Sequence, residues 1–201
     1  MDILTAIHTR RSIREFLPKK VPRELLEKII EAAGRAPSDE NNQPWHFTIV
    51  EDENIKNKIA HISVEAGKKY FGAKKNDLLK KFSTMGRARC EEMVERFTSG
   101  SLFSFLGNAP VLIVISSKND VFSHCSTGAA VQNLLLAAME FDLATCWTVI
   151  GLTDPEGNDQ IKNIVHIPND RIIVSVLALG YPAQEPKPRG RKKISEIFTW
   201  I

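Results

Sequence analysis

Residues 36–47 place the strongest constraint on the fold, because they carry two prolines and a tryptophan between a helical and a strand-like pattern. They read Ala-Pro-Ser-Asp-Glu-Asn-Asn-Gln-Pro-Trp-His-Phe. Proline fixes its own φ and restricts the residue before it, so we expect Ala36 and Gln43 to be extended rather than helical. The short polar side chains of this stretch are expected to hydrogen-bond to nearby backbone. They are Ser38, Asp39, Asn41 and Asn42.

This loop has two interpretations. Turns of this composition are common, and Trp45 could simply fill part of the core. Alternatively, a stiff loop could present neutral donors and acceptors to a ligand, with Trp45 as an aromatic plate. Features at both ends of the chain favour the second interpretation.

Three guanidinium groups stand within five residues near the N-terminus, directly after a helix predicted over residues 2–9. They belong to Arg10, Arg11 and Arg14, with the hydroxyl of Ser12 between them. One interpretation is a solvated helix end, where cations are stabilised by the helix dipole. The other is an anion clamp, because guanidinium groups match phosphate oxygens in a bidentate way and Ser12 adds a donor.

Apolar periodicity places the remaining secondary structure. We expect helices over residues 22–34, 54–70 and 153–165, and one starting at Asp120 or Ser123 that contains the apolar run 129–139. We expect strands over residues 46–50, 111–115, 144–150 and 172–179. Strands 111–115 and 172–179 are apolar throughout, which is typical of central strands. The helix with run 129–139 is apolar on nearly all faces, so Gln132 and Asn133 should need hydrogen-bond partners.

Two further segments differ from this pattern. Residues 67–107 mix lysines with phenylalanines, a combination that could bind single-stranded nucleic acid. Acidic residues at positions 91, 92 and 95 interrupt that charge, so a helical excursion or lid is favoured. Residues 182–201 combine a proline-rich arm, a basic run and an apolar end, which we expect to dock on a partner subunit.

Composition excludes several classes of protein. The length of 201 residues suits one domain, and a net charge of +3 does not argue for nucleic acid. No secretory signal or membrane-spanning run is visible. Three cysteines at wide spacing suggest neither disulfides nor zinc, so we expect a cytosolic protein. Because no nucleophile–base pair can be proposed, an enzyme of this sequence would need a cofactor to carry the chemistry.

Three motifs occur in a fixed order: R-R-S-x-R at 10–14, P-S-x-x-N-x-Q-P-W at 37–45, and G-Y-P…P-x-P-R-G-R-K from 180. Together with residues 130–138 and 145–147, they resemble the FMN-dependent nitroreductase family. The resemblance implies an α+β nitroreductase-like fold, with a mostly antiparallel central sheet wrapped by helices. It also implies an intertwined homodimer with FMN at the interface. We expect 1–201 to form one domain, with an arm at 182–201 and a helical lid or excursion at 67–107, which lies outside the resemblance.

The resemblance assigns cofactor contacts to specific residues. Those implied to hold the FMN phosphate are Arg10, Ser12, Arg189 and Arg191. Arg11 would contribute mainly its backbone, and Arg14 would approach the N1/O2 edge of the flavin ring. Those implied to reach the flavin of the other subunit are Pro37, Ser38, Asn41 and Gln43. The resemblance also implies that one backbone stretch passes the N5 side of the flavin ring with its amides. This stretch is Val149, Ile150 and Gly151.

One motif departs from the family. The family more often has Trp-Ile-Gly directly, whereas this chain reads Trp-Thr-Val-Ile-Gly at 147–151. The register of the N5 contact therefore stays open.

The implied activity is transfer of electrons from NADH or NADPH, through FMN, to a nitroaromatic, a quinone or a similar electron-poor acceptor. Charge supports this assignment independently, because clustered arginines could neutralise the phosphate and Arg14 could stabilise a negative charge at N1 of the reduced ring. Dehalogenases, flavin-consuming synthases and metabolite dehydrogenases are alternatives on the same fold. A non-enzymatic flavin-binding protein and a nucleic-acid module are alternatives of other classes. No catalytic residue is assigned.

Overall fold

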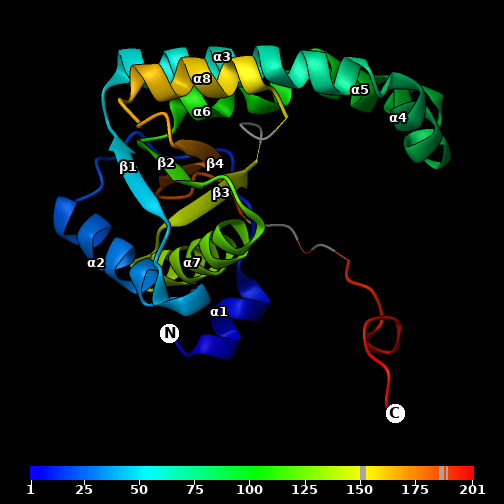
Figure 1. Cartoon of the computed structure of the whole chain (residues 1–201). Coiled ribbons are helices and arrows are strands. Elements are labelled where there is room, and N and C mark those ends of the chain that lie inside the picture. Colours follow the sequence, from blue (N-terminus) through cyan, green and yellow to red (C-terminus); the bar gives the residue numbers. More distant parts are fainter. Residues whose placement is uncertain (150–152, 186–187, 189) are drawn as a thin grey trace.

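The structure is a four-stranded antiparallel sheet enclosed between two layers of helices (Figure 1). This computed structural model describes residues 1–149, 153–185, 188 and 190–201. The strands follow the order β1-β2-β4-β3, and each neighbouring pair is antiparallel. Their bounds are β1 His46–Val50, β2 Val111–Lys118, β3 Ala144–Thr148 and β4 Arg171–Gly180. The expected α+β architecture is confirmed.

The two central strands, β2 and β4, have both faces buried, as their uninterrupted apolar sequences predicted. Successive side chains of a strand point to opposite faces of the sheet. In β2, Leu112 and Val114 enter the core on one face, whereas Ile113 and Ile115 enter the core on the other. A register shift between Ile115 and Ser116, near the C-terminal end of β2, interrupts the pairing of β2 with β4.

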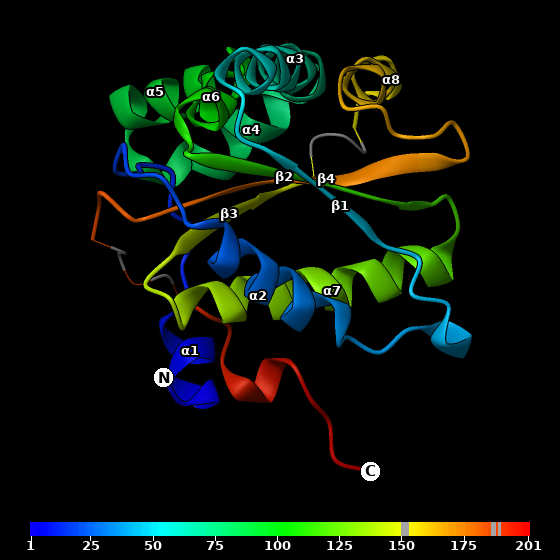
Figure 2. The same ribbon diagram turned by 90° about the vertical axis from the view of Figure 1, so that its left-hand side faces the viewer.

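One face of the sheet is covered by the helices α2 and α7, and α1 lies beyond α7 on the side away from the sheet, as Figure 2 shows. Their bounds are α1 Ile3–Thr9, α2 Arg23–Gly34 and α7 Val121–Met139. Asp120 caps α7 by accepting a hydrogen bond from the backbone N–H of Ser123 at 2.8 Å. Asn133 donates to the backbone carbonyl of Ala32 at 3.3 Å, as an amide at this position requires. Gln132 is exposed, so the expectation that it is buried is wrong, because its face of α7 is left uncovered by the described chain.

The opposite face is covered by α3, α6 and α8, whose bounds are α3 Glu53–Gly72, α6 Phe105–Asn108 and α8 Pro155–Ile164. Helix α3 extends two residues past its expected end at Tyr70. Helix α8 begins after Asp154 rather than after Thr153, because Pro155 is well suited to the first helical position. Ile59 and Ile161 are almost fully buried where α3 and α8 meet the sheet.

Residues 67–107 are mostly helical. After α3, the chain forms a hairpin of α4 (Lys75–Phe82) and α5 (Arg87–Thr98). This hairpin has a small core of its own, formed by Leu78, Phe82, Cys90 and Val94. It extends beyond the edge of the sheet in Figure 1. Its action as a lid stays a prediction.

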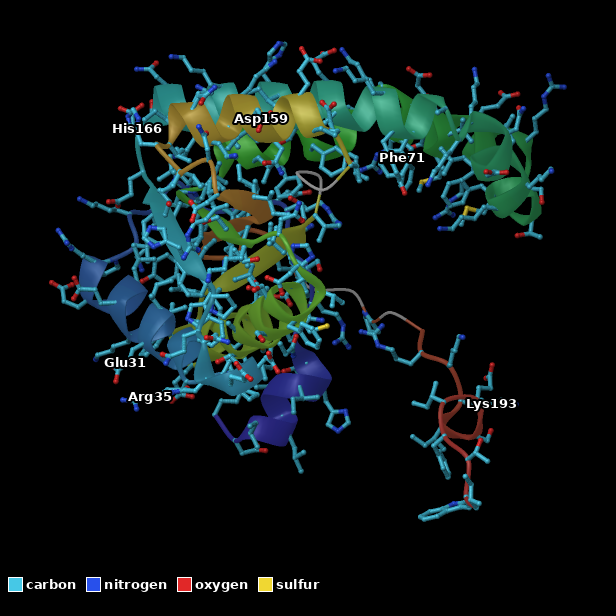
Figure 3. All side chains as sticks on the ribbon, in the orientation of Figure 1. Glu31, Arg35, Phe71, Asp159, His166 and Lys193 are labelled. Carbon is cyan, nitrogen blue, oxygen red and sulfur yellow. The ribbon has the colours of Figure 1, made fainter. Side chains whose placement is uncertain are left out.

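The segment that follows α1 lies along the edge strand β3 and beside the residues that follow β4. The backbone N–H of Ile13 donates to the carbonyl of Thr145 at 3.0 Å. Leu17 donates in the same way to Tyr181 at 2.9 Å. The arm then leaves the body, as the position of Lys193 in Figure 3 shows. No helix among the described residues is long and apolar enough to cross a bilayer.

Candidate functional site

A polar cleft lies where the segment after α1 meets the start of the arm, and we call it the arginine cleft. Its volume is about 650 Å³. Its walls are residues 10–15 after α1, the start of the arm, and one residue of α5. The lining residues are Arg10, Arg11, Ser12, Ile13, Arg14, Glu15, Arg96, Gln184, Glu185 and Arg191. Four residues that the sequence assigned to the cofactor's phosphate or ring therefore come together: Arg10, Ser12, Arg14 and Arg191.

The cleft concentrates positive charge, because five arginines and only two carboxylates, those of Glu15 and Glu185, are among its lining residues. Burial lowers the pKa of the Arg10 guanidinium below its usual value, and the charges of Arg191 and Arg11 lower it further. The group still carries its charge at neutral pH, because the ordinary pKa of arginine is so high. Among the described residues, no carboxylate forms an ion pair with Arg10, Arg14 or Arg191. This donor set fits an anion such as a phosphate.

Arg11 differs from its neighbours because backbone carbonyls already occupy its side chain. One of its terminal nitrogens donates to the carbonyls of His8 and Arg10, both at 2.8 Å. Its Nε is buried and has no partner among the described residues. An assignment of Arg11 to cofactor contacts through its backbone is compatible with this arrangement and stays a prediction.

A second hollow, the aromatic pocket, shares Arg14 with the arginine cleft. Its volume is about 250 Å³. The other lining residues are Tyr70, Phe71, Leu102, Phe103, Phe105, Trp147, Thr148, Val149 and Thr153. The Arg14 guanidinium carbon lies 5.7 Å from the centroid of the Phe105 ring, within the range of a cation–π contact. Figure 3 shows Phe71 on the side of the helical layer that faces the sheet.

The aromatic side chains of this pocket were missed by the sequence analysis, which assigned no site residue within 67–107. The available signal was the density of phenylalanines in that segment. The local sequence pattern did not distinguish the residues that line the pocket from those that form the core of the hairpin. Of the backbone stretch expected near the flavin N5, Val149 lines this pocket. Ile150, Gly151 and the phosphate-assigned Arg189 lie outside the described residues.

The amide loop, residues 37–43, lies far from the arginine cleft within one chain. Its Asp39 N–H donates to the hydroxyl of Ser126, near the start of α7. Arg10 and Arg11 line a cavity together with Met139, the last residue of α7. The α7 segment from Ser126 to Met139 is about 20 Å long at 1.5 Å per residue. The structure of one chain therefore does not bring the loop and the arginines together.

The amide loop has an unusual backbone. Glu40, Asn41 and Gln43 have φ values of 47°, 57° and 44°, a region that residues other than glycine seldom adopt. The expectation that Gln43 is extended is wrong, because its N–H donates to the Ser38 hydroxyl at 3.0 Å and this bond closes the loop. The Gln43 side chain also donates to the Asn41 carbonyl at 3.2 Å.

The exposure of the loop residues bears on its two interpretations. Pro37, Asn41 and Gln43 are exposed, and Ser38 and Trp45 are half-buried. The loop therefore presents its amides outward, while Trp45 also covers part of the protein interior. Such strain and outward polarity are typical of binding loops.

Comparison with known proteins identifies relatives over most of the chain. The sequence profile of the Nitroreductase family matches residues 7–181. A Methanothermobacter thermautotrophicus protein named "Putative NADH dehydrogenase/NAD(P)H nitroreductase" is 33% identical over 198 residues, which cover 94% of this chain and 82% of the relative. The iodotyrosine deiodinase of Thermotoga neapolitana is 32% identical over 183 residues, which cover 90% and 88%.

A solved structure agrees with these sequence matches. The crystal structure of an oxidised iodotyrosine deiodinase bound to FMN and 3-iodo-L-tyrosine is 30% identical, with a TM-score of 0.74. The match covers 96% of this chain and 95% of that chain. On the strength of its fold and of the match over residues 7–181, the chain belongs to the nitroreductase family of oxidoreductases.

Proposed function

We propose that the protein is an FMN-dependent oxidoreductase that takes electrons from NADH or NADPH and passes them to a nitroaromatic, a quinone or a similar electron-poor acceptor. The observation that carries this proposal is the pairing of two hollows, one rich in arginines and one lined by aromatic rings, with Arg14 in both. An FMN molecule has a phosphate at one end and a flat ring at the other.

The residues present fit this cofactor. A doubly charged phosphate would relieve the repulsion that lowers the pKa of Arg10, and Ser12 offers a further donor. The aromatic pocket offers apolar walls to a planar ring. When bound, FMN supplies reversible acceptance and donation of two electrons.

The roles of the protein side chains follow from charge and polarity. Arg14 holds a fixed positive charge between the two hollows, where it would stabilise negative charge that develops on a bound ring. The rings of Tyr70 and Phe71 lie in edge-to-face contact, with centroids 5.0 Å apart, and they form a hydrophobic wall for an acceptor. No side chain of the pocket is assigned as a proton donor.

We propose that the working form is a homodimer, because one chain leaves the amide loop about 20 Å of helix away from the arginines. In this arrangement Pro37, Ser38 and Asn41 of one copy reach the cleft of the other. Apolar side chains on the arm support an interface: Ile194, Ile197, Phe198 and Trp200 are exposed in the single chain, Trp200 to 88%. Exposed apolar groups of this size are stabilised by burial against a partner.

A second candidate function is reductive removal of a halogen from an aromatic ring. It is supported by the 32% identity to the Thermotoga neapolitana iodotyrosine deiodinase and by the 30% identity to the FMN-bound deiodinase structure. The aromatic pocket could accept a halogenated phenol as readily as a nitroaromatic.

The cytosolic location expected from the sequence is compatible with three free cysteines.

Anaerobic stopped-flow measurement of the flavin tests both candidates. We expect NADH or NADPH to bleach the bound flavin, and an acceptor panel of a nitroaromatic, a quinone and a halogenated tyrosine to restore its colour at different rates. A purified protein that is colourless and takes up no added FMN would contradict the proposal. Bound flavin that neither nicotinamide bleaches would indicate a non-enzymatic binding protein instead.

A further inference from the structure

One arginine of the arginine cleft comes from neither end of the chain. Arg96 belongs to α5 in the helical hairpin, about eighty residues from the other arginines, and its side chain lines the same cleft. None of the cofactor contacts assigned from the sequence includes it. It therefore represents a third segment of the chain that brings positive charge to this place.

The local sequence offers Arg96 a different partner, which it does not use. Earlier in the same helix, Arg87 pairs with Glu91 four residues later, with 3.0 Å between Nε and Oε1. Glu92 stands in the equivalent position four residues before Arg96, yet no ion pair joins them in the described chain. A cation in the last turn of a helix is favoured by the dipole, but the dipole does not explain why this one faces other arginines.

The part of α5 that carries Arg96 is held firmly. The next residue, Phe97, packs edge-to-face on Phe71 with ring centroids 4.9 Å apart. The carbonyl of Arg96 accepts a hydrogen bond from the Ser101 hydroxyl. Arg96 lines the same cleft as Arg10 and Arg191, so an anion bound among these like charges would be strongly stabilised.

We propose that Arg96 binds the phosphate of FMN, so that the α4–α5 hairpin takes part in holding the cofactor. This inference rests on the proposed function, because it takes FMN to be the ligand of the cleft. It assigns the hairpin a role at the phosphate end of the cofactor, in addition to the wall that its neighbouring aromatics form around the ring.

The test compares FMN with riboflavin, which has the same ring and no phosphate. Flavin-free protein is titrated with each ligand, and binding is followed by the loss of flavin fluorescence. We expect Arg96→Gln to weaken FMN about 10- to 100-fold, the effect of losing a charged hydrogen bond, and to leave riboflavin affinity unchanged. Arg96→Lys should lie between the wild type and Arg96→Gln.

Arg89→Gln is the matched control. Arg89 is an exposed arginine on the same helix, two turns or about 10 Å from Arg96, and it does not line the cleft. It should leave both affinities unchanged. Thermal unfolding of the flavin-free variants shows whether each is folded.

The outcomes separate this inference from the proposed function. Unchanged FMN affinity in a folded Arg96→Gln variant would overturn the inference, and so would an equal loss for FMN and riboflavin. Failure of the wild-type protein to bind either flavin would instead overturn the proposed function.

Discussion

The arginine cleft and the amide loop are both polar and exposed, yet they satisfy their polar groups in opposite ways. In the cleft, burial and the like charges of Arg191 and Arg11 lower the pKa of Arg10, and Arg10 has no ion pair within the described chain. In the loop, Ser38 accepts from Gln43, and Gln43 donates to Asn41. The cleft is therefore incomplete without an anion, whereas the loop holds its shape without a ligand. Changes in the cleft should alter binding without lowering the stability of the flavin-free protein, whereas changes in the loop should lower that stability as well.

The largest expected effect is on cofactor binding in the cleft. Arg10→Ala should weaken FMN by about 1.5–3 kcal/mol, because a charged hydrogen bond to the phosphate is lost. The midpoint of thermal unfolding of the flavin-free protein should not fall, because the substitution also removes a repulsive charge. Fluorescence titration and thermal unfolding measure the two quantities.

The control for this change is Arg35→Ala on the outer surface of α2, where Arg35 pairs with Glu31 (Figure 3). That exposed pair should contribute little to stability and nothing to FMN affinity. Unchanged FMN binding in Arg10→Ala would remove Arg10 from the phosphate site. A large drop in stability of the flavin-free variant would show that the cleft is not strained by its charge.

A smaller effect is expected in the loop. Ser38→Ala should lower the free energy of unfolding by about 1 kcal/mol, because the Gln43 N–H loses its acceptor. The midpoint of chemical denaturation measures it. Equal stability of variant and wild type would mean that another group fixes the loop, and the contrast with the cleft would then be weaker.

The smallest effect is expected at Glu40, whose φ of 47° is unfavourable for any residue with a side chain. Glu40→Gly should raise the free energy of unfolding by about 0.5 kcal/mol, because relief of backbone strain outweighs the entropy that glycine adds to the unfolded chain. Glu40→Ala keeps the Cβ atom and should not stabilise. A stabilising Glu40→Ala would point to charge rather than to backbone strain.

The sequence predicted those parts of the fold that depend on local patterns. The apolar runs of β2 and β4 were identified as central strands, and the caps and apolar stripes placed most helices within a few residues. Gln132 was expected in the core because α7 is apolar on nearly all faces. Which face stays uncovered depends on the packing of other elements, and a single helix sequence contains no such information.

The candidate site was predictable to a similar extent. Motifs at both chain ends identified the arginines that meet in the cleft. The conformation of Gln43 was not predictable from its proline neighbour, because a hydroxyl five residues earlier decides it. Arg96 was missed because the sequence around the basic residues of 67–107 does not distinguish a residue that lines the cleft from one on the outer surface. Only the packing of α5 places Arg96 at the cleft.

The central claim is that one site combines the arginine cleft of one copy with the amide loop of another. Mixing two differently tagged variants, Arg10→Ala and Asn41→Ala, and isolating the mixed dimer tests it most directly. If the site is shared, one of the two sites in the mixed dimer has an intact cleft and an intact loop. We therefore predict that the mixed dimer binds one FMN with wild-type affinity. A mixed dimer without any wild-type site would contradict the claim.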